Sequence, residues 1–576
     1  MIKPIKKKLF FSPKFEIPKT QFYLLFFLGF CLILGAIFRF TLLTFKPIWT
    51  DEFATLVFSL GNNYNLVPLN EIITIDQLLK PLEYNPDSNI SQIASLLINE
   101  DNHPPLYFVL ANLWYKLFSH PHKYLSLNVA RAFPAFLSLL SIPAIYYLAK
   151  ISFLSRQNAY LATWLMTVSP YSIYLAQEAR HYSLGILLVT ASICCLVTII
   201  KLQSQLKVIP FSLLFLWGII NILGFLTHYF FLITLASEAI ALVIYYFNLI
   251  RKKNKYNSNY LVKIRHNLIK LSWLAIVIFL VIICWFVFII PQDYGNDMTS
   301  WIESDNSSFL AIISPVFQLI ATLITMVSLL PVESTYLPLV IISGLMMILF
   351  FIWLLPQIFT GIKLALSKDK FKIIQSLVIF CLTSITIFLL ITYGLNLDIT
   401  RGARYSFVYF PIVILLVATS LSNNQFFSQP KSLLILGCMG LLSAVTVTSN
   451  LGYQKYYRPD LLIPIINHNS EHNILIATTH QTLVQTGEMM GIAWQVKDNK
   501  NSAQIKFLLV HQNYQNDPKA TLILQEKINN IDSPLDLWLV NFYAPIKLNN
   551  CSVNNLKKFP SIDGYNYNLY RCFPLK

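Results

Sequence analysis

The chain has 576 residues, of which 55% are hydrophobic and only 12% are charged. A soluble globular protein carries about 25% charged residues, so this composition excludes an ordinary soluble enzyme. The net charge of +16 would suit a nucleic-acid partner, but the basic residues lie mainly in short loops between apolar runs. That distribution is typical of orientation signals in a membrane protein and argues against a nucleic-acid-binding face.

Apolar runs of span length recur along the first three quarters of the chain. Because a run of roughly 20 residues crosses a bilayer, we predict a polytopic α-helical membrane protein with about 11 full spans and two partial ones. A simple count of apolar runs gives about 13. Both totals are odd, so a cytoplasmic N-terminus places the C-terminus outside the cell membrane.

The first run, 21–45, follows the lysine-rich residues 1–8. It is too long for the apolar core of a signal peptide and no small-residue cleavage site follows, so we expect a retained span with its basic end in the cytoplasm. We predict the runs 104–118 and 309–330 to be partial spans. The second is assigned as re-entrant or surface-lying, because a full crossing would place the basic segment 363–372 outside. The other full spans are predicted at 124–150, 158–176, 183–200, 208–227, 229–250, 271–290, 337–356, 373–393, 405–421 and 432–449.

The loop 46–104 contains eight acidic residues and two lysines, which places it outside the membrane. Two short interfacial helices are predicted within it, at 66–79 and 90–98. These features suggest two domains. A transmembrane domain, 1–449, carries the chemistry, and an extracytoplasmic domain, 450–576, follows it.

The tail is polar and asparagine-rich. Its short apolar runs have the length of strands and predict a small α/β domain; they lie at 474–478, 505–510, 520–524 and 537–542. Six cysteines fall in apolar spans, where small packing residues are expected. The other two, Cys551 and Cys572, either form a disulfide or remain free thiols in the tail.

The adjacent carboxylates Asp51 and Glu52 follow the first span directly. One could act as a base while the other orients a partner. The alternative is a pair of solvated loop acids. Trp49 and Phe53 flank the pair and favour an apolar, membrane-proximal setting, in which a carboxyl pKa rises.

Three later stretches, 102–106, 177–182 and 401–405, are expected to converge on these acids. In the first, two prolines after His103 fix the backbone at the membrane boundary, where Asp101 could pair with the imidazole. A plain junction between loop and helix is the alternative. The third stretch carries Arg401 and Arg404, two outer-face arginines suited to a lipid phosphate. Simple attraction to anionic headgroups is the alternative for that pair.

The second stretch lies where an outward span ends, and ionisable residues at that depth are costly and usually functional. An interfacial cluster is the alternative, with its acid and its arginine neutralising each other and its tyrosine in the aromatic belt. The polar residues of this stretch are Gln177, Glu178, Arg180, His181 and Tyr182.

The order of these motifs resembles the membrane glycosyltransferases of the GT-C fold. The resemblance covers roughly residues 20–420 and consists of an Asp-Glu pair after the first span, His-Pro-Pro-Leu-Tyr, Gln-Glu-Ala-Arg-x-Tyr-Ser-Leu, and Ala-Arg-Tyr before a late span. The most similar branch is the protein-mannosyltransferase-like family, glycosyltransferase family 39 in the broad sense, which includes lipid A sugar transferases. No single motif is specific, and the tail matches none.

The resemblance implies that a sugar is moved from a polyprenyl-phosphate donor to a glycan, lipid or protein acceptor on the outer side, with inversion. By this resemblance Asp51 is the general base and Glu52 its companion, and His103 faces the donor phosphate. Arg404 and Tyr405 match the late motif, with Arg401 beside them. Gln177, Glu178, Arg180 and Tyr182 match the motif that shapes the site.

Two other functions remain open at this stage. A flippase for lipid-linked sugars would also need arginines for phosphate, but it should show internal repeats, and none is seen. A non-enzymatic envelope-assembly protein would place its function in the tail. Acidic loops also bind divalent cations, but no spacing is specific enough to assign a metal or any other cofactor.

Overall fold

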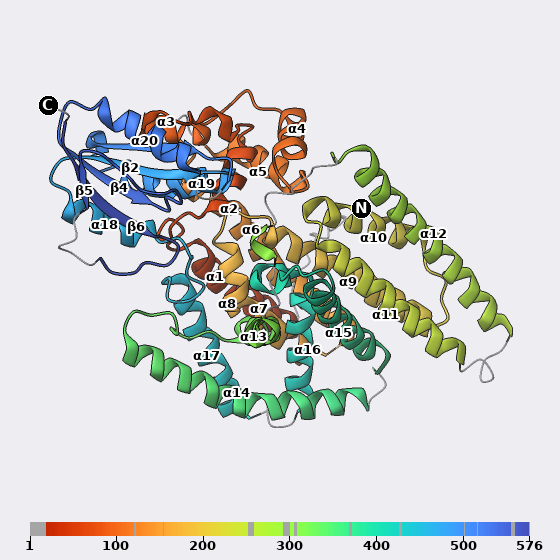
Figure 1. The fold of residues 1–576 in the computed structure, drawn as a ribbon. Coiled ribbons are helices and arrows are strands. Elements are labelled where there is room, and N and C mark those ends of the chain that lie inside the picture. Colours follow the sequence, from red (N-terminus) through yellow and green to blue (C-terminus); the bar gives the residue numbers. More distant parts are fainter. Residues whose placement is uncertain are drawn as a thin grey trace, which may run out of the picture.

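The computed structural model describes residues 19–119, 123–153, 155–251, 258–291, 300–303, 308–367, 371–424, 429–499, 502–514, 517–553 and 559–574. Within these ranges, nine helices are long and apolar enough to cross a membrane. The chain is therefore a multi-span helical membrane protein. Figure 1 shows the long helices gathered in one body, with a small sheet at one end of it.

The nine helices are α1 (Lys19–Phe40), α6 (Leu127–Phe153), α9 (Tyr182–Ser204), α11 (Phe231–Arg251), α12 (Ser258–Phe288), α13 (Phe309–Val327), α14 (Leu337–Leu366), α15 (Phe371–Gly394) and α17 (Pro430–Thr448). Three shorter apolar helices are α5 (Leu106–Phe118), α10 (Phe211–Thr227) and α16 (Phe410–Asn423). The predicted break between the spans 208–227 and 229–250 is confirmed, since α10 ends at Thr227 and α11 begins at Phe231.

Fewer helices reach span length than the sequence predicted. The segment 158–176 is broken into α7 (Arg156–Val168) and α8 (Pro170–Ala176). The break lies at Ser169, whose hydroxyl accepts a hydrogen bond from the backbone N–H of Ser172 and caps α8. The segment 309–330, expected to be partial, forms the 19-residue helix α13. Its place relative to the membrane stays a prediction.

A buried arginine holds the C-terminal end of α1. The Arg39 side chain is fully buried and donates hydrogen bonds to Ser138 of α6, to Ser172 of α8 and to the carbonyl of Met166 in α7, each at 2.9 Å. Because a buried guanidinium without partners is costly, this network fixes the four helices in one arrangement. The loop that carries Asp51 starts from this fixed point.

The loop after α1 contains α2 (Thr50–Ser59), a 3₁₀ turn (Tyr64–Leu66), β1 (Ile72–Thr74), α3 (Ile75–Leu78) and α4 (Ile90–Glu100). The helix predicted at 90–98 is confirmed by α4. The helix predicted at 66–79 is wrong, because most of that segment forms β1 and turns. Strand β1 pairs with a strand more than 400 residues later, so no local pattern could reveal it.

The tail forms an α/β unit, as expected. Its strands are β2 (Asn473–His480), β3 (Ile505–His511), β4 (Leu535–Val540), β5 (Cys551–Val553) and β6 (Tyr567–Cys572), and its helices are α18 (Pro459–Asn469), α19 (Leu483–Val496) and α20 (Pro518–Asn529). The strand order is β1-β3-β2-β4-β6-β5, with β3, β2 and β4 mutually parallel. The sheet is thus completed at one edge by β1 of the loop that follows α1.

The strand predicted at 520–524 is wrong, because this segment lies in α20. Asp517 caps the helix by accepting from the backbone N–H of Lys519, and Pro518 occupies the first turn. Both are start signals of a helix. The buried residues Ala520, Leu524 and Ile528 follow at helical spacing and pack under the sheet.

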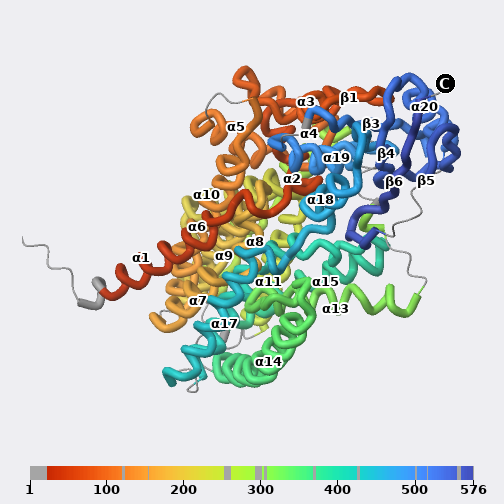
Figure 2. The backbone as a smooth tube through the Cα atoms, turned by 90° about the vertical axis from the view of Figure 1, so that its left-hand side faces the viewer, coloured from red at the N-terminus to blue at the C-terminus, as the bar shows by residue number. Residues whose placement is uncertain are grey.

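Helix α19 lies between the tail sheet and α2. A Cβ added to Gly487 would lie 3.4 Å from Thr50, and one added to Gly491 would lie 3.6 Å from the carbonyl of Ile48. Two glycines one helical turn apart therefore allow α19 to approach the start of α2 closely. Figure 2 shows the loop that follows α1 and the C-terminal elements side by side at one end of the molecule.

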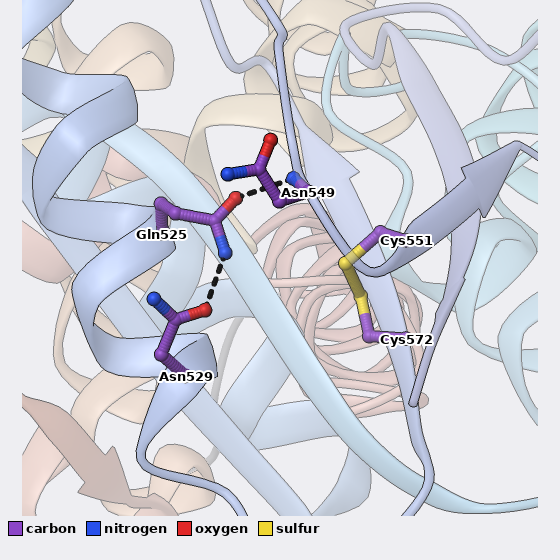
Figure 3. The surroundings of a disulfide bond; sticks show 5 residues. All are labelled: Gln525, Asn529, Asn549, Cys551 and Cys572. Carbon is purple, nitrogen blue, oxygen red and sulfur yellow. Dashed lines mark hydrogen bonds between the residues drawn. A yellow bond between two sulfur atoms is a disulfide. The ribbon is translucent and has the colours of Figure 1, made fainter. Parts of the chain in front are cut away.

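Cys551 and Cys572 form a disulfide between the paired strands β5 and β6 (Figure 3). Beside it, the Gln525 side chain donates to Asn529 and accepts from the backbone N–H of Asn549, both at 2.6 Å. These contacts tie the edge of the sheet to α20.

Replacing both cysteines with serine is expected to destabilise the tail by about 2–4 kcal/mol, because the 21-residue separation is no longer closed by a covalent bond. Thermal unfolding of the detergent-solubilised protein measures the change. Reductant should lower the transition temperature of the parent and leave that of the double variant unchanged. Two free thiols in the folded, unreduced parent would contradict the bond.

Candidate active site

Asp51 lies in the first turn of α2 and keeps 32% of its side chain exposed. Its Oδ2 is 3.2 Å from Nη2 of Arg404 and 3.6 Å from Nη2 of Arg180. The two arginines belong to the 3₁₀ segment η7 (Ala403–Val408) and to the connection between α8 and α9. The fold thus brings arginines from two separate stretches to one accessible carboxylate.

The neighbouring acid Glu52 is fully buried. Both of its oxygens accept from Arg131 of α6 at 2.7 Å, and Oε1 also accepts from the backbone N–H of Ala179 at 2.8 Å. Burial alone would raise the pKa of this carboxyl group, but the Arg131 guanidinium holds it below its ordinary value. Glu52 therefore clamps α2 to α6 and to the loop before α9, while Asp51 alone of the pair faces solvent.

Arg180 links Asp51 to the His103 stretch. It is buried and donates through Nη1 to the backbone carbonyl of Asp51 at 2.7 Å and to Oγ1 of Thr55 at 2.8 Å. Its Nη2 lies 3.1 Å from Nε2 of His103, whose Nδ1 lies 3.1 Å from the carboxylate of Asp101. Since a carboxylate accepts and a guanidinium only donates, His103 carries its proton on Nδ1 and accepts through Nε2.

Arg404 is held among aromatic rings. Its guanidinium carbon lies 4.8 Å from the ring centre of Trp49, 5.1 Å from that of Trp301 and 5.0 Å from that of Tyr405. Within the part of the chain that the structure describes, its Nε has no hydrogen-bond partner. Trp49 also lies 4.6 Å from Nζ of Lys455. Cation–π contacts thus fix the guanidinium while one N–H donor stays unpaired.

Two residues of the stretch 177–182 contact groups around the site without reaching Asp51. Glu178 is buried and forms an ion pair with Lys455, which also lies 4.9 Å from the ring of Tyr174. Gln177 donates to the carbonyls of Phe38 at 2.9 Å and Thr41 at 3.0 Å and so fixes the end of α1. Neither side chain contacts Asp51.

Of the remaining predicted residues, Tyr182 lies at the site and Arg401 lies away from Asp51. Tyr182 is fully buried and its ring lies 5.7 Å from the guanidinium of Arg180. Arg401 is not brought to Asp51. It pairs with Asp398 at 3.3 Å and donates to the carbonyl of Trp301 at 2.8 Å, so it holds the segment beside Arg404.

Lys455 is part of this site and was not predicted from the sequence. It lies between α17 and α18, where no motif marks it, and burial lowers its pKa well below the ordinary value. Lys46 is a second buried lysine near the site, and burial with the charge of Arg131 lowers its pKa to about 7. The only sequence signal for either is a basic residue just outside a span.

His181 and His228 form an imidazole cluster with His103. The ring centre of His181 lies 4.6 Å from that of His228 and 5.2 Å from that of His103. Burial, with the charge of His228 and then of Arg180, lowers the pKa of His181 well below its ordinary value, so its ring is neutral at neutral pH. Among the described residues, no group of three or more His, Cys, Asp or Glu side chains has the geometry of a metal site.

The fold and the site define a multi-span membrane protein with a polar site of arginines and one accessible carboxylate. No family model matches the chain, and no curated protein matches it. Solved structures of ArnT from Cupriavidus metallidurans are similar at 9% identity. The apo form gives a TM-score of 0.49 over 91% of this chain and 93% of ArnT, and the form bound to undecaprenyl phosphate gives 0.48 over 96% and 98%.

The apo oligosaccharyltransferase of Archaeoglobus fulgidus is similar at 12% identity, with a TM-score of 0.46 over 91% of this chain and 70% of that one. At these identities and TM-scores the likenesses assign no activity to this chain. A function has to be supported by the geometry around Asp51.

Proposed function

We propose that this protein is a GT-C glycosyltransferase, which moves a sugar from a polyprenyl-phosphate donor to an acceptor hydroxyl on the outer side of the cell membrane. The observation that carries the proposal is the accessible carboxylate of Asp51 within ion-pair distance of Arg404 and Arg180. A base beside two phosphate-binding cations is the minimum that transfer from a lipid phosphate requires.

The reaction is a single displacement. The acceptor oxygen attacks the anomeric carbon while the bond from that carbon to the phosphate oxygen breaks, and polyprenyl phosphate leaves with the electron pair. Asp51 takes the proton of the acceptor hydroxyl. One base and one displacement invert the anomeric centre, whereas retention by double displacement would need a second carboxylate in the site. Glu52 cannot serve as that carboxylate because it is buried against Arg131.

Arg404 is suited to the leaving phosphate. Its Nε is buried without a partner among the described residues, and its Nη2 contacts only the exposed carboxylate of Asp51 by ion pair. A phosphate can therefore accept from Nε and an Nη together, in the bidentate geometry that guanidinium favours. Binding of the donor would move Arg404 from Asp51 to phosphate and free the carboxylate to act as base.

The experiment is a transfer assay with the purified full chain in detergent. A panel of labelled polyprenyl-phosphate sugars serves as donors and a membrane extract as the acceptor source. Movement of label onto an acceptor supports the transferase. Binding of the donors without any transfer would contradict it and favour a flippase. In detergent a flippase has no membrane across which to move the lipid-linked sugar, so it would bind the donor and form no product.

Replacing Arg404 with glutamine is expected to lower kcat/KM by about 10²–10³, because the charge on the leaving phosphate loses its preorganised donor. Arg401→Gln is the matched control. That arginine lies in the same loop, has 39% of its side chain exposed and pairs with Asp398 instead of Asp51. Its loss should change the rate by less than about fivefold. Equal losses in the two variants would contradict the role of Arg404.

The proposed orientation has the N-terminus in the cytoplasm and the tail outside. A disulfide within the tail is consistent with this side of the membrane, since disulfides persist in oxidising compartments.

A further inference from the structure

A cluster of tyrosines lies at the carboxyl ends of the tail strands. We name it the tyrosine cluster; it consists of Tyr456, Tyr457, Tyr543 and Tyr565 around the buried acid Glu488. Tyr456 is 67% exposed and Tyr543 is 44% exposed, whereas Tyr565 and Glu488 are more than nine-tenths buried. Two exposed tyrosines thus lie near two buried polar side chains, Tyr565 and Glu488, which we call the floor of the cluster.

The cluster occupies a special position in the topology. Strand β2 is flanked by β3 on one side and β4 on the other, and the chain reaches β4 only after passing through β3. The strand order therefore reverses between β2 and β4. In open parallel sheets, ligands bind outside the carboxyl ends of the strands at such a reversal. Asn541 follows β4 directly and supplies the amide of the floor.

Hydrogen bonds fix the polar side chains of the floor in place. Asn541 donates through Nδ2 to Glu488 at 3.1 Å and to the carbonyl of Gly564 at 2.9 Å. Gly564 has a φ of +82°, and a Cβ there would lie 2.7 Å from the ring of Tyr457. Only glycine allows this approach, which packs the ring of Tyr457 at 5.6 Å from that of Tyr565.

One polar atom of the floor is unsatisfied. The Tyr565 hydroxyl is buried and has no hydrogen-bond partner within the described ranges. A buried hydroxyl without a partner is costly, and a bound group that hydrogen-bonds to it removes the cost. The carboxyl of Glu488, hydrogen-bonded to Tyr457 and Asn541, offers further acceptor capacity beside it.

We infer that the tyrosine cluster binds a saccharide and is the acceptor-glycan subsite of this transferase. Exposed tyrosine rings present apolar faces to the C–H face of a sugar ring, and their hydroxyls, Glu488 and Asn541 can exchange hydrogen bonds with sugar hydroxyls. A cationic ligand fits less well. Burial raises the pKa of Glu488, which weakens its charge, and Arg458 beside the cluster is itself a cation.

The cluster is continuous with the catalytic site. Lys455 enters the site through its ion pair with Glu178, and the next two residues along the chain are Tyr456 and Tyr457 of the cluster. Glu488 lies on α19, next to Gly487, which packs on Thr50 at the start of α2. A glycan bound at the cluster can therefore extend towards Asp51. That the bound saccharide is the acceptor rests on the proposed function. The binding of saccharide at the cluster does not.

The test measures saccharide binding by the full chain in detergent, without donor. Tetrasaccharides of N-acetylglucosamine, of mannose and of glucose are the probes, and saturation-transfer NMR and titration calorimetry are the readouts. At least one probe is expected to bind, and Tyr456→Ala and Tyr543→Ala are each expected to weaken it about fivefold or more. Glu488→Gln, which keeps the shape, tests the floor and should also weaken binding.

Phe573→Ala is the matched control. This aromatic residue is 53% exposed but follows β6, whose end pairs with the start of β4, so it lies at the opposite end of the sheet. Its loss should leave binding unchanged. Asp51→Asn should also bind as the parent does. In the transfer assay the tyrosine variants should raise the KM for acceptor and leave kcat unchanged.

Three results would overturn the inference: no binding of any probe, equal binding in the tyrosine variants and the parent, or loss of binding to anionic phospholipid vesicles in those variants with saccharide binding intact. The last result would make the cluster a membrane anchor. Failure of the proposed function is distinguishable, since saccharide binding at the cluster without transfer from any donor removes the reaction and leaves the binding site.

Discussion

Replacing Asp51 with asparagine is expected to reduce sugar transfer by about 10²–10⁴-fold, the contribution of a positioned general base. The substitution keeps the shape of the side chain and removes only its ability to take a proton. Because Asp51 is partly exposed and asparagine has nearly the same shape, expression should be normal. Initial rates with a saturating labelled donor measure the loss.

The controls separate catalysis from binding and from loop charge. Donor binding should be unchanged or tighter in the asparagine variant, because Arg404 and Arg180 no longer pair with a charged Asp51. Asp76→Asn changes an exposed acid of the same loop after α1. Asp76 pairs with Lys123 at 2.8 Å, and its loss should leave the rate near that of the parent. Turnover close to normal in Asp51→Asn would remove this residue as the base.

Replacing Arg131 with methionine is expected to destabilise the protein by about 3–5 kcal/mol, because it leaves Glu52 buried without its partner. The two side chains are only 1% and 0% exposed, so water cannot compensate. The measurement is thermal unfolding in detergent, read from tryptophan fluorescence. An effect typical of a surface residue, within about 0.5 kcal/mol, would contradict the clamp.

A double variant isolates the pair. Combining Arg131→Met with Glu52→Gln removes both charges, and its loss of stability should be smaller than the sum of the single losses.

The pH dependence of the stability that Glu52 contributes has a definite sign. The folded pKa of Glu52 is depressed, so its contribution is complete above the pKa of the unfolded chain and is lost as pH falls through the folded value. The Arg131→Met variant should lack this acid-dependent loss.

Apolar length was readable from the sequence alone. The composition and the recurring runs gave the membrane class, and most of the predicted spans correspond to helices within a few residues. Strands were also predicted at the positions of β2, β3 and β4, but not their parallel pairing. Such signals are local, because the length and periodicity of an apolar run report burial of that same run.

The divided roles of Asp51 and Glu52 depended on the fold. The sequence marks both as acids beside a span, but only the contact of α2 with α6 buries Glu52 against Arg131 and leaves Asp51 accessible. Similarly, the sequence cannot separate Arg404 from Arg401, two arginines in one short loop. The aromatic rings that hold Arg404 come from chain segments more than 100 residues apart.

The sequence by itself thus determined that the chain has segments long and apolar enough to cross a membrane and that its tail contains short strands. Only the tertiary structure decided that β1 joins the sheet of the tail, that Lys455 reaches the site and that the tyrosine cluster lies beside it. The physical reason is the range of the interactions. Apolar length acts within one segment, whereas strand pairing and buried ion pairs depend on partners hundreds of residues away.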